Sequence, residues 1–438
     1  MKYFLSLILV YSFSSILCTV KTQNYNCTDT IRIMQYNLLY YGTNYDDCNQ
    51  TTNPVEQKEQ YLRTIVNYYK PDILSCNELG KNEAVSNRLL DSVFNYNDSS
   101  IYAKANISNV SNSNIINMLF YNTNKLGLLS QTSIKTDYRD ITIHKLYYKT
   151  NNYCWNNDTA FIHCISVHLK AGNTEAAARK VMVDSLIKYL NYLSKVPENM
   201  ILIGDLNVYG ASEPAFQALI NNTNLNIRFY DPVNQIGEWH DNINYKYYHT
   251  QSTRTSGNGC YTTGGFDDRF DFILTSSDIL NGPYKYVKYI PNSYKIPGQD
   301  GQRFKKSLIN PANYSAPSNI ITAMYELSDH LPVFLDLLVA PNVGILNYTN
   351  NNSINLITPN PIKNNEHIKL QINADGNSKA IIQLFNITGN KLLEYNVNIN
   401  KGNQIVDIIY EKLTQGIYLL KFIDTNNLFS QTIKIIII

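Results

Sequence analysis

Five short motifs in the first 340 residues each place a polar residue at the end of an apolar, strand-like run. This feature constrains the fold more than any other, because strand ends at one edge of a layered sheet bring their side chains to a shared cleft. In chain order the first four motifs are IRIMQYNLL with Asn37, LSCNELG with Glu78, CISVHLKAGN with His168, and MILIGDLNVYG with Asp205 and Asn207. The fifth is a pair of stretches, FDDRFDFIL with Asp271 and LSDHLPV with Asp329 and His330. Each motif alone is explained by an ordinary turn, a surface acid or a buried histidine. Their succession indicates an active site.

The region between Thr30 and Val339 alternates short apolar runs with longer amphipathic ones, which is typical of an α/β or α+β layered enzyme. The expected elements include strands at 31–36, 73–76 and 200–203 and helices over 57–69 and from about 174 to 193. Asn173 or Thr174 is expected to cap the second of these helices, because both side chains can accept a hydrogen bond from a free backbone N–H.

The chain, at 438 residues, is longer than one hydrophobic core usually organises, which predicts two folded units. Its first residues combine a lysine at position 2 with an uncharged apolar stretch at 3–17, the layout of a secretory signal peptide. After Val339 the composition shifts to asparagine and threonine, and then to β-type runs separated by glycine and asparagine turns. The expected divisions are a signal peptide at 1–23, a catalytic domain at 24–340, a linker at 341–357 and a small all-β sandwich at 358–438.

Charge and cysteine content narrow the function only slightly. The formal net charge of +2 gives no broad field that would attract a polyanion, so charge alone does not nominate nucleic acid. Six cysteines follow the leader, and none lies in a metal-binding pattern. Cys27 with Cys48, or Cys154 with Cys260, are candidate disulfides in an exported chain, and their order alone does not decide the pairing.

The five motifs resemble those of the endonuclease/exonuclease/phosphatase superfamily, which includes DNase I-like nucleases, neutral sphingomyelinases and inositol phosphatases. The resemblance covers roughly residues 31–339, and its most specific marks are the GD-x-N and SDH-x-P motifs. It implies a four-layer α/β (α+β) sandwich, in which two mixed β-sheets lie face to face with helices outside. The active site of such a fold lies across the strand ends.

The resemblance also implies a metal site and a site for the attacking water. Glu78 is similar to the principal metal ligand of the family, with Asp329 and Asn37 completing the site directly or through water. Oxygen ligands of this kind suit Mg²⁺ or Mn²⁺, with Ca²⁺ as an alternative. Asp205 and Asn207 are similar to the residues that position the attacking water and hold a phosphate oxygen.

Two histidines are implied to contact the scissile phosphate. His330 is similar to the family's phosphate-binding histidine, and Asp271 to the carboxylate that orients it, since a bound acid fixes the ring tautomer and favours its charged form. Asp268 is the alternative for this carboxylate. His168 is expected to donate a hydrogen bond to the phosphate from the other side.

His168 also bears on the substrate, because the exonuclease III-like repair branch usually has a different residue at this strand end. Abasic-site repair is therefore disfavoured. The first choice is a secreted endonuclease that cleaves DNA or RNA, because a secreted scavenging enzyme meets such polymers, and no obligate protein partner is inferred. The alternatives are a sphingomyelinase-like or inositol phosphate phosphatase activity and, less favoured, an inactive surface-binding protein. Basic residues in segment 284–318 are equally consistent with a phosphate-tracking rim and with a solvated loop.

The C-terminal module carries TPNPIKNN at 358–365, a central LFNITGNKL and a late GIYLLKF. These stretches resemble the sorting domain of the type IX secretion system of Bacteroidota, and the alternative is a generic carbohydrate-binding or spacer sandwich. The resemblance implies the type IX machinery as a partner. It also implies a protein that is secreted or attached to the cell surface.

Overall fold

In the computed structural model the chain divides into two compact units, the first ending at Gly344 and the second beginning at Ile345. The described residues are 28–45, 47–97, 100–149, 159–280, 286–340, 353–364, 366–374, 377–410, 413–424 and 430–438. The expected signal peptide lies outside them, as do Cys27 and Cys154. Among the helices of these residues, none combines the length and the apolar character of a membrane span.

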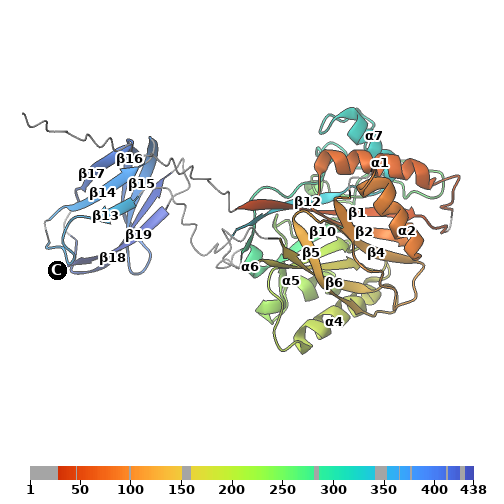
Figure 1. Ribbon diagram of the computed structural model, residues 1–438, viewed down its shortest axis with the longest axis horizontal. Helices are drawn as coiled ribbons and strands as arrows, with labels where there is room; N and C mark the ends of the chain where they lie inside the picture. The colour runs from red at the N-terminus through yellow and green to blue at the C-terminus, as the bar shows by residue number, and fades with distance from the viewer. Residues whose placement is uncertain are drawn as a thin grey trace, which may run out of the picture. The chain divides into compact units, whose positions relative to one another are not determined.

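Two six-stranded mixed sheets form the centre of the first unit (Figure 1). The first sheet has the order β11 (Val287–Tyr289), β12 (Val333–Val339), β1 (Asp29–Tyr41), β2 (Ile73–Gly80), β4 (Ile115–Asn122) and β3 (Tyr102–Lys104). The second has the order β5 (Leu126–Ile134), β6 (Ile141–Tyr148), β7 (Phe161–His168), β8 (Met200–Asp205), β10 (Asp271–Ser276) and β9 (Phe229–Tyr230). Neighbouring strands run antiparallel except in the pairs β1/β2 and β7/β8, which are parallel.

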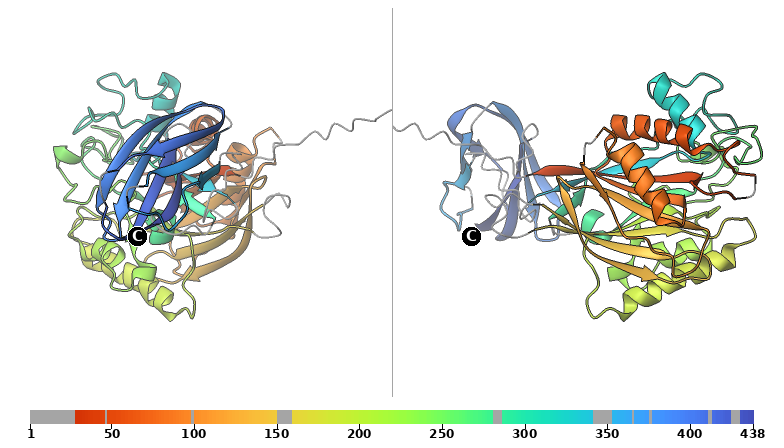
Figure 2. Two further views of the ribbon diagram at one scale, coloured as in Figure 1. Left: turned by 90° about the vertical axis from the view of Figure 1, so that its left-hand side faces the viewer. Right: turned by 45° about the vertical axis from the view of Figure 1, so that its right-hand side comes forward.

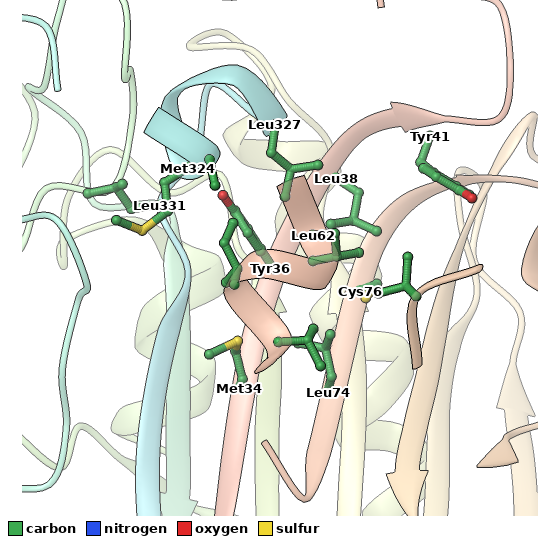
Figure 3. Close-up of a cluster of buried hydrophobic side chains, with 14 of the residues drawn as sticks. Met34, Tyr36, Leu38, Tyr41, Leu62, Leu74, Cys76, Met324, Leu327 and Leu331 are labelled. Carbon is green, nitrogen blue, oxygen red and sulfur yellow. The ribbon is translucent and has the colours of Figure 1, made fainter. Parts of the chain in front are cut away.

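Helices cover the outer faces of both sheets, as Figures 1 and 2 show. They are α1 (Val55–Tyr69), α2 (Glu83–Leu89), α4 (Ala176–Tyr192), α5 (Pro214–Ile220) and α7 (Ser318–Leu327). The short helix α6 (Ser277–Leu280) follows β10, and its Ile279 belongs to the cluster between the sheets. One buried cluster packs the first sheet against α1 and α7 (Figure 3), a second packs the other sheet against α4 and α5, and a third fills the space between the sheets. These four layers confirm the expected sandwich.

Strand β1 illustrates how the sequence produces this layering. Ile31 and Ile33 belong to the cluster between the sheets, whereas Met34 and Tyr36 belong to the cluster under α1 and α7. A strand that is buried on both faces reads as a nearly continuous apolar run, because successive side chains point to opposite sides. The central position of β1 in its sheet therefore follows from its composition.

The two predicted helices are present, with one correction at an N-terminus. Helix α1 ends at Tyr69, and Lys70 follows in the left-handed conformation at φ 48° before Pro71. Helix α4 has Glu175 as its N-cap, so the expected cap at Asn173 or Thr174 was wrong. The backbone N–H of Glu175 donates to the carbonyl of Gly172, which places residues 173 and 174 inside a turn that precedes the helix.

The C-terminal unit consists of two antiparallel sheets around its own hydrophobic cluster (Figure 2). The three-stranded sheet has the order β13 (Ser353–Leu356), β14 (Ile368–Ala374) and β17 (Gly402–Ile408), and the four-stranded sheet has the order β16 (Lys391–Ile399), β15 (Ser378–Asn386), β18 (Gly416–Asp424) and β19 (Ser430–Ile437). The expected small all-β sandwich is confirmed. Strand β13 pairs with β14 inside the range assigned to the linker, so the unit begins earlier than residue 358.

Candidate active site

Asn37 and Glu78 lie toward the C-terminal ends of the neighbouring parallel strands β1 and β2, at the same end of the first sheet. Asn37 pairs with Asn77, and the register between the two strands shifts directly after this pair. Glu78 and Tyr40 have positive φ angles of 63° and 51°, which residues with side chains seldom adopt. Irregularities of this kind recur beside active sites, where they redirect a side chain. Here they allow Glu78 to face the strand ends of the second sheet.

One amide group bridges the carboxylates of the two sheets. Asn37 Nδ2 donates to Glu78 Oε1 at 2.9 Å and to Asp205 Oδ2 at 3.1 Å. The backbone N–H of Tyr40 donates to the other oxygen of Glu78 at 3.2 Å. Glu78 and Asp205 are therefore fixed close together, although they belong to different sheets.

The second sheet brings His168, Asp205 and Asp271 side by side. Asp205 pairs with His168 in the parallel register of β7 and β8, and with Asp271 in the antiparallel register of β8 and β10. His168 Nε2 lies 3.7 Å from both Glu78 Oε1 and Asp205 Oδ2. Three separate motifs thus meet at one buried point, as their strand-end positions predict.

The GD-x-N motif has a steric requirement at its glycine. A Cβ atom at Gly204 would lie 1.8 Å from the carbonyl oxygen of Val167, so any side chain here would displace β7 from β8. After the glycine, Asp205 Oδ1 accepts the backbone N–H of Asn207 at 2.9 Å. Asn207 has a φ of 50°, and its Nδ2 donates to the carbonyl oxygen of Leu169 at 3.2 Å. The motif therefore holds both polar side chains at the strand end.

His330 and Asp271 form a buried pair. His330 Nδ1 lies 2.7 Å from Asp271 Oδ2, and Gln35 Nε2 donates to the other carboxylate oxygen at 3.3 Å. Burial alone would lower the pKa of His330, but the charges of Asp271, Asp205 and Asp329 raise this pKa well above its ordinary value. These charges favour the protonated form of the imidazole.

Asp268, the alternative partner for His330, bonds a different histidine. Its Oδ1 lies 2.7 Å from Nδ1 of His240, a residue that lies outside all five motifs. Burial raises the pKa of Asp268 to about 6, and the hydrogen bond to His240 opposes this rise. Of the two carboxylates considered, Asp271 is the one placed to orient His330.

Asp329 lies beside the His330–Asp271 pair. One of its carboxylate oxygens accepts hydrogen bonds and the other accepts none from the residues that the structure describes. Its Oδ2 accepts the backbone N–H of Thr262 at 2.9 Å and the side-chain amide of Gln251 at 3.4 Å. The same Gln251 Nε2 lies 2.7 Å from His330 Nε2. Asp329 Oδ1 is buried and has no hydrogen-bond partner among the described residues. An unpaired buried carboxylate oxygen is costly, which points to a further partner.

Three residues of the site were missed by the sequence analysis. Arg139 donates to two backbone carbonyls at the end of β7, at 3.0 and 2.7 Å. Gln251 touches the buried pair as described above, and Asn77 Oδ1 accepts the backbone N–H of Asp205 at 3.0 Å. Asn77 directly precedes Glu78 in its motif, which was a usable signal. Nothing in the local sequence marks Arg139 or Gln251.

The donor set fits a hard divalent cation. Ligand atoms of Glu78, His168 and Asp205 lie within 4.8 Å of one another. Burial raises the pKa of Glu78, and burial raises that of Asp205 to about 7. This group shares only Glu78 with the expected ligands Glu78, Asp329 and Asn37. Asp329 has a free oxygen, and its charge acts on Glu78. Asn37 turns its amide nitrogen to Glu78, and its Oδ1 accepts the backbone N–H of Leu39 at 2.9 Å.

Cys48 and Cys260 form a disulfide that spans 212 residues of sequence. Both predicted pairings, Cys27 with Cys48 and Cys154 with Cys260, were therefore wrong. The bond joins the loop after β1 to the segment that leads to Thr262, and only the folded sheets bring these two segments together. It consequently ties together two loops that border the site.

Two cations of the basic segment at 284–318 form ion pairs with carboxylates of the same unit. Arg303 is buried and bonds Asp300 at 2.9 Å, and Lys305 Nζ lies 2.6 Å from Asp241 Oδ1. These two cations are therefore not free to follow a phosphate backbone, which weakens the interpretation of this segment as a phosphate-tracking rim.

Comparison with known proteins gives a family match for the C-terminal unit and solved structures that are similar over most of the chain. Residues 356–438 match the family model of the secretion system C-terminal sorting domain, and a domain of this kind indicates secretion or attachment at the cell surface. No curated protein matches the chain.

Three solved structures illustrate the similarity of fold. The human Nocturnin catalytic domain with bound sulfate is 17% identical, with a TM-score of 0.41. The match covers 71% of this chain and 97% of the Nocturnin chain. A humanised D. rerio TDP2 is 14% identical with a TM-score of 0.42, covering 70% and 98%. An endonuclease/exonuclease/phosphatase from Beutenbergia cavernae is 12% identical with a TM-score of 0.40, covering 92% and 99%. The chain thus joins a unit with the four-layer fold that its motifs implied to a secretion system C-terminal sorting domain.

Proposed function

We propose that the first unit is a secreted, divalent-metal-dependent phosphodiester hydrolase. One observation carries the proposal: the His330–Asp271 pair, at 2.7 Å, lies beside Asp205, which shares the amide of Asn37 with Glu78. In-line attack of water on a phosphate ester needs an imidazole that donates to the phosphate, a carboxylate that accepts the proton of the water and a cluster of oxygen ligands.

Asp205 is proposed to accept the proton of the attacking water. Burial raises the pKa of Asp205, which makes its carboxylate a stronger base than one exposed to solvent. The water oxygen bonds to phosphorus as the bond to the leaving oxygen breaks, and the leaving oxygen takes a proton from solvent. Asn207, held beside Asp205 by its backbone N–H, is proposed to bind a phosphate oxygen.

The two histidines are proposed to bind the phosphate from two sides in different protonation states. His330 meets the developing negative charge as an imidazolium, because the surrounding carboxylates raise its pKa well above the ordinary value. Burial lowers the pKa of His168 well below its ordinary value, so His168 is neutral and donates a single hydrogen bond. Asn37 is proposed to contact the substrate as well as the metal.

Glu78, Asp329 and Asn37 are proposed to hold Mg²⁺ or Mn²⁺, with Ca²⁺ as an alternative. Such an ion would neutralise charge on the phosphate oxygens. The free buried oxygen of Asp329 supports a cation at this point.

Three alanine variants test the proposal directly. Glu78→Ala, Asp205→Ala and His330→Ala should each lower kcat for bis(p-nitrophenyl) phosphate by roughly a hundredfold or more, the usual cost of removing one group that stabilises the transition state. His163→Gln, at the opposite end of β7 from His168, is the matched control and should retain activity. Wild-type rates in all three folded alanine variants would refute the proposal.

The substrate is proposed to be DNA or RNA, cleaved internally, because an exported enzyme of this chemistry meets such polymers outside the cell. Activity should be compared on plasmid DNA, RNA, sphingomyelin and inositol phosphates, with Mg²⁺ present. Cleavage of only the last two would replace the nuclease by a sphingomyelinase-like or phosphatase activity. Tight nucleic-acid binding without any hydrolysis would instead favour a surface-binding protein.

Export is proposed to use a signal peptide at 1–23 and the type IX secretion machinery. The sorting-domain match over residues 356–438 supports the second step. Deleting residues 341–438 should leave the enzyme in the periplasm, as measured by activity in cell fractions. Normal secretion of the truncated chain would contradict this route.

A further inference from the structure

His240 and Asp268 form a second histidine–carboxylate pair that the proposed mechanism does not use. The distance from His240 Nδ1 to Asp268 Oδ1 is 2.7 Å. The Asp268 side chain is 12% exposed, whereas that of His240 is 52% exposed. Among the described residues His240 Nε2 has no hydrogen-bond partner, so the pair presents a free ring nitrogen to solvent.

The backbone places this pair on the same face as His330. Gln251 forms isolated antiparallel bridges with both Asp268 and His330. Residues directly opposite one another in such bridges project to one side, with about 5 Å between their Cβ atoms. The side chains of Asp268, Gln251 and His330 therefore line one face, and Asp268 lies on the order of 10 Å from His330, two rungs away.

Tyr209 borders the pair on the side of the GD-x-N motif. Its carbonyl oxygen accepts the backbone N–H of His240 at 3.0 Å, and its ring packs edge-on against the imidazole with centroids 5.0 Å apart. Burial, and then the charges of Asp268, Glu213 and Asp205, raise the pKa of Tyr209, and the charge of Arg179 opposes this rise. The Tyr209 hydroxyl has no hydrogen-bond partner within the described residues. Two free polar groups thus adjoin the reaction centre.

The local charge indicates what kind of group would bind here. Three carboxylates, those of Asp241, Asp267 and Asp268, lie around His240, and the charged groups that oppose them are Lys305 and the histidines His240 and His330. Lys305 Nζ is already held 2.6 Å from Asp241 Oδ1. Lys305 is therefore not available to bind a phosphate, and the carboxylates of Asp267 and Asp268 would repel one placed beside His240. An uncharged group with hydroxyls would be accepted.

We propose that His240, Tyr209 and Asp268 form a subsite for an uncharged, hydroxyl-bearing group, such as a sugar, attached to the scissile phosphate. The proposal rests on phosphodiester hydrolysis at Asp205 and His330. His240 Nε2 and the Tyr209 hydroxyl bond the hydroxyls of this group. Asp268 is a positioning residue, because its bond to Nδ1 fixes the tautomer and orientation of the imidazole.

The test compares two esters with the same p-nitrophenolate leaving group and a single phosphate. One is methyl p-nitrophenyl phosphate, and the other is the p-nitrophenyl ester of thymidine 5′-phosphate. His240→Ala should lower the ratio of kcat/KM for the thymidine ester to that for the methyl ester roughly five- to tenfold, the loss expected for one hydrogen bond. Tyr209→Phe should change this ratio in the same direction.

The matched control is His367→Ala, in the similarly exposed His367–Asp407 pair of the C-terminal unit, which is bonded at 3.2 Å. It should leave kcat/KM for both esters unchanged. Adding a 3′-phosphate to the thymidine ester should not raise kcat/KM of the wild type, because the patch repels a second phosphate.

An unchanged ester ratio in both His240→Ala and Tyr209→Phe would overturn the subsite, and so would a gain from the added phosphate. If the wild type hydrolyses the methyl ester and the variants show no selective loss, only the subsite fails. If the wild type hydrolyses neither ester, the proposed function fails and the subsite falls with it.

Discussion

Two histidine–aspartate pairs of this protein share one contact distance and differ in burial. In the buried pair, His330–Asp271, the side chains are 4% and 0% exposed, and in the rim pair, His240–Asp268, they are 52% and 12% exposed, with an N–O distance of 2.7 Å in both. Water does not screen the carboxylates around the buried pair, so they raise the pKa of His330 despite its burial. The comparison teaches that burial, more than contact geometry, suits one pair to stabilise charge and the other to select a neutral group.

The largest expected effect is a difference in kcat/KM between variants of the two carboxylates, Asp271 and Asp268. Asp271→Asn leaves the shape of the buried pair intact but removes the charge that holds His330 as an imidazolium, so kcat/KM for the methyl ester should fall roughly a thousandfold or more. Asp268→Asn should lower the same constant less than tenfold. Steady-state rates of both variants check this, and a loss under tenfold in Asp271→Asn would remove the distinction between the pairs.

Removing the disulfide tests whether the His330–Asp271 and His240–Asp268 pairs depend on the same loops. Replacing Cys48 and Cys260 by alanine should lower the free energy of unfolding by about 2–5 kcal/mol, because the bond closes a long loop. It should also lower kcat/KM for the methyl ester, since Thr262, two residues after Cys260, holds Asp329 beside the buried pair. The ester ratio that reports on the rim pair should stay constant. Urea denaturation measures the change in stability, and steady-state rates measured without urea, on folded variant, measure the change in kcat/KM. An unchanged free energy of unfolding would contradict the account.

A third histidine shows what burial does when no carboxylate is present. Burial lowers the pKa of His144 to about 4, and its Nδ1 has no partner among the described residues. Between pH 6.5 and 4 the unfolded chain binds a proton that the folded chain does not, so this group makes stability fall as the pH falls. The loss should be about 2 kcal/mol between pH 7 and pH 5.

His144→Gln should remove this part of the pH dependence. Urea unfolding of the wild type and the variant at pH 7 and pH 5 measures the difference between their slopes. Parallel slopes would show that burial alone does not set the charge of a histidine in this core, which would weaken the contrast between the two pairs.

The fold was predictable because its signals are local. The apolar run of β1 and the amphipathic pattern of α1 each contain enough information to place one element in a layer. The motifs likewise located Glu78, Asp205 and His330 at strand ends. The partners of Asp268 and Cys260 were not predictable, because they come from segments that meet only after the sheets have packed. Arg139 was missed for the same reason, since its bonds go to backbone carbonyls that carry no sequence signal.

The central claim is that the buried constellation hydrolyses phosphodiesters with the help of a bound cation. The most direct measurement is hydrolysis of methyl p-nitrophenyl phosphate by the full chain after treatment with EDTA, followed by titration with Mg²⁺ or Mn²⁺ and calorimetry of Mn²⁺ binding on the same sample. The account predicts that activity disappears with the chelator and returns with the ion, and that Glu78→Gln loses both binding and activity. Full activity in EDTA, or wild-type rates in Glu78→Gln, would contradict it.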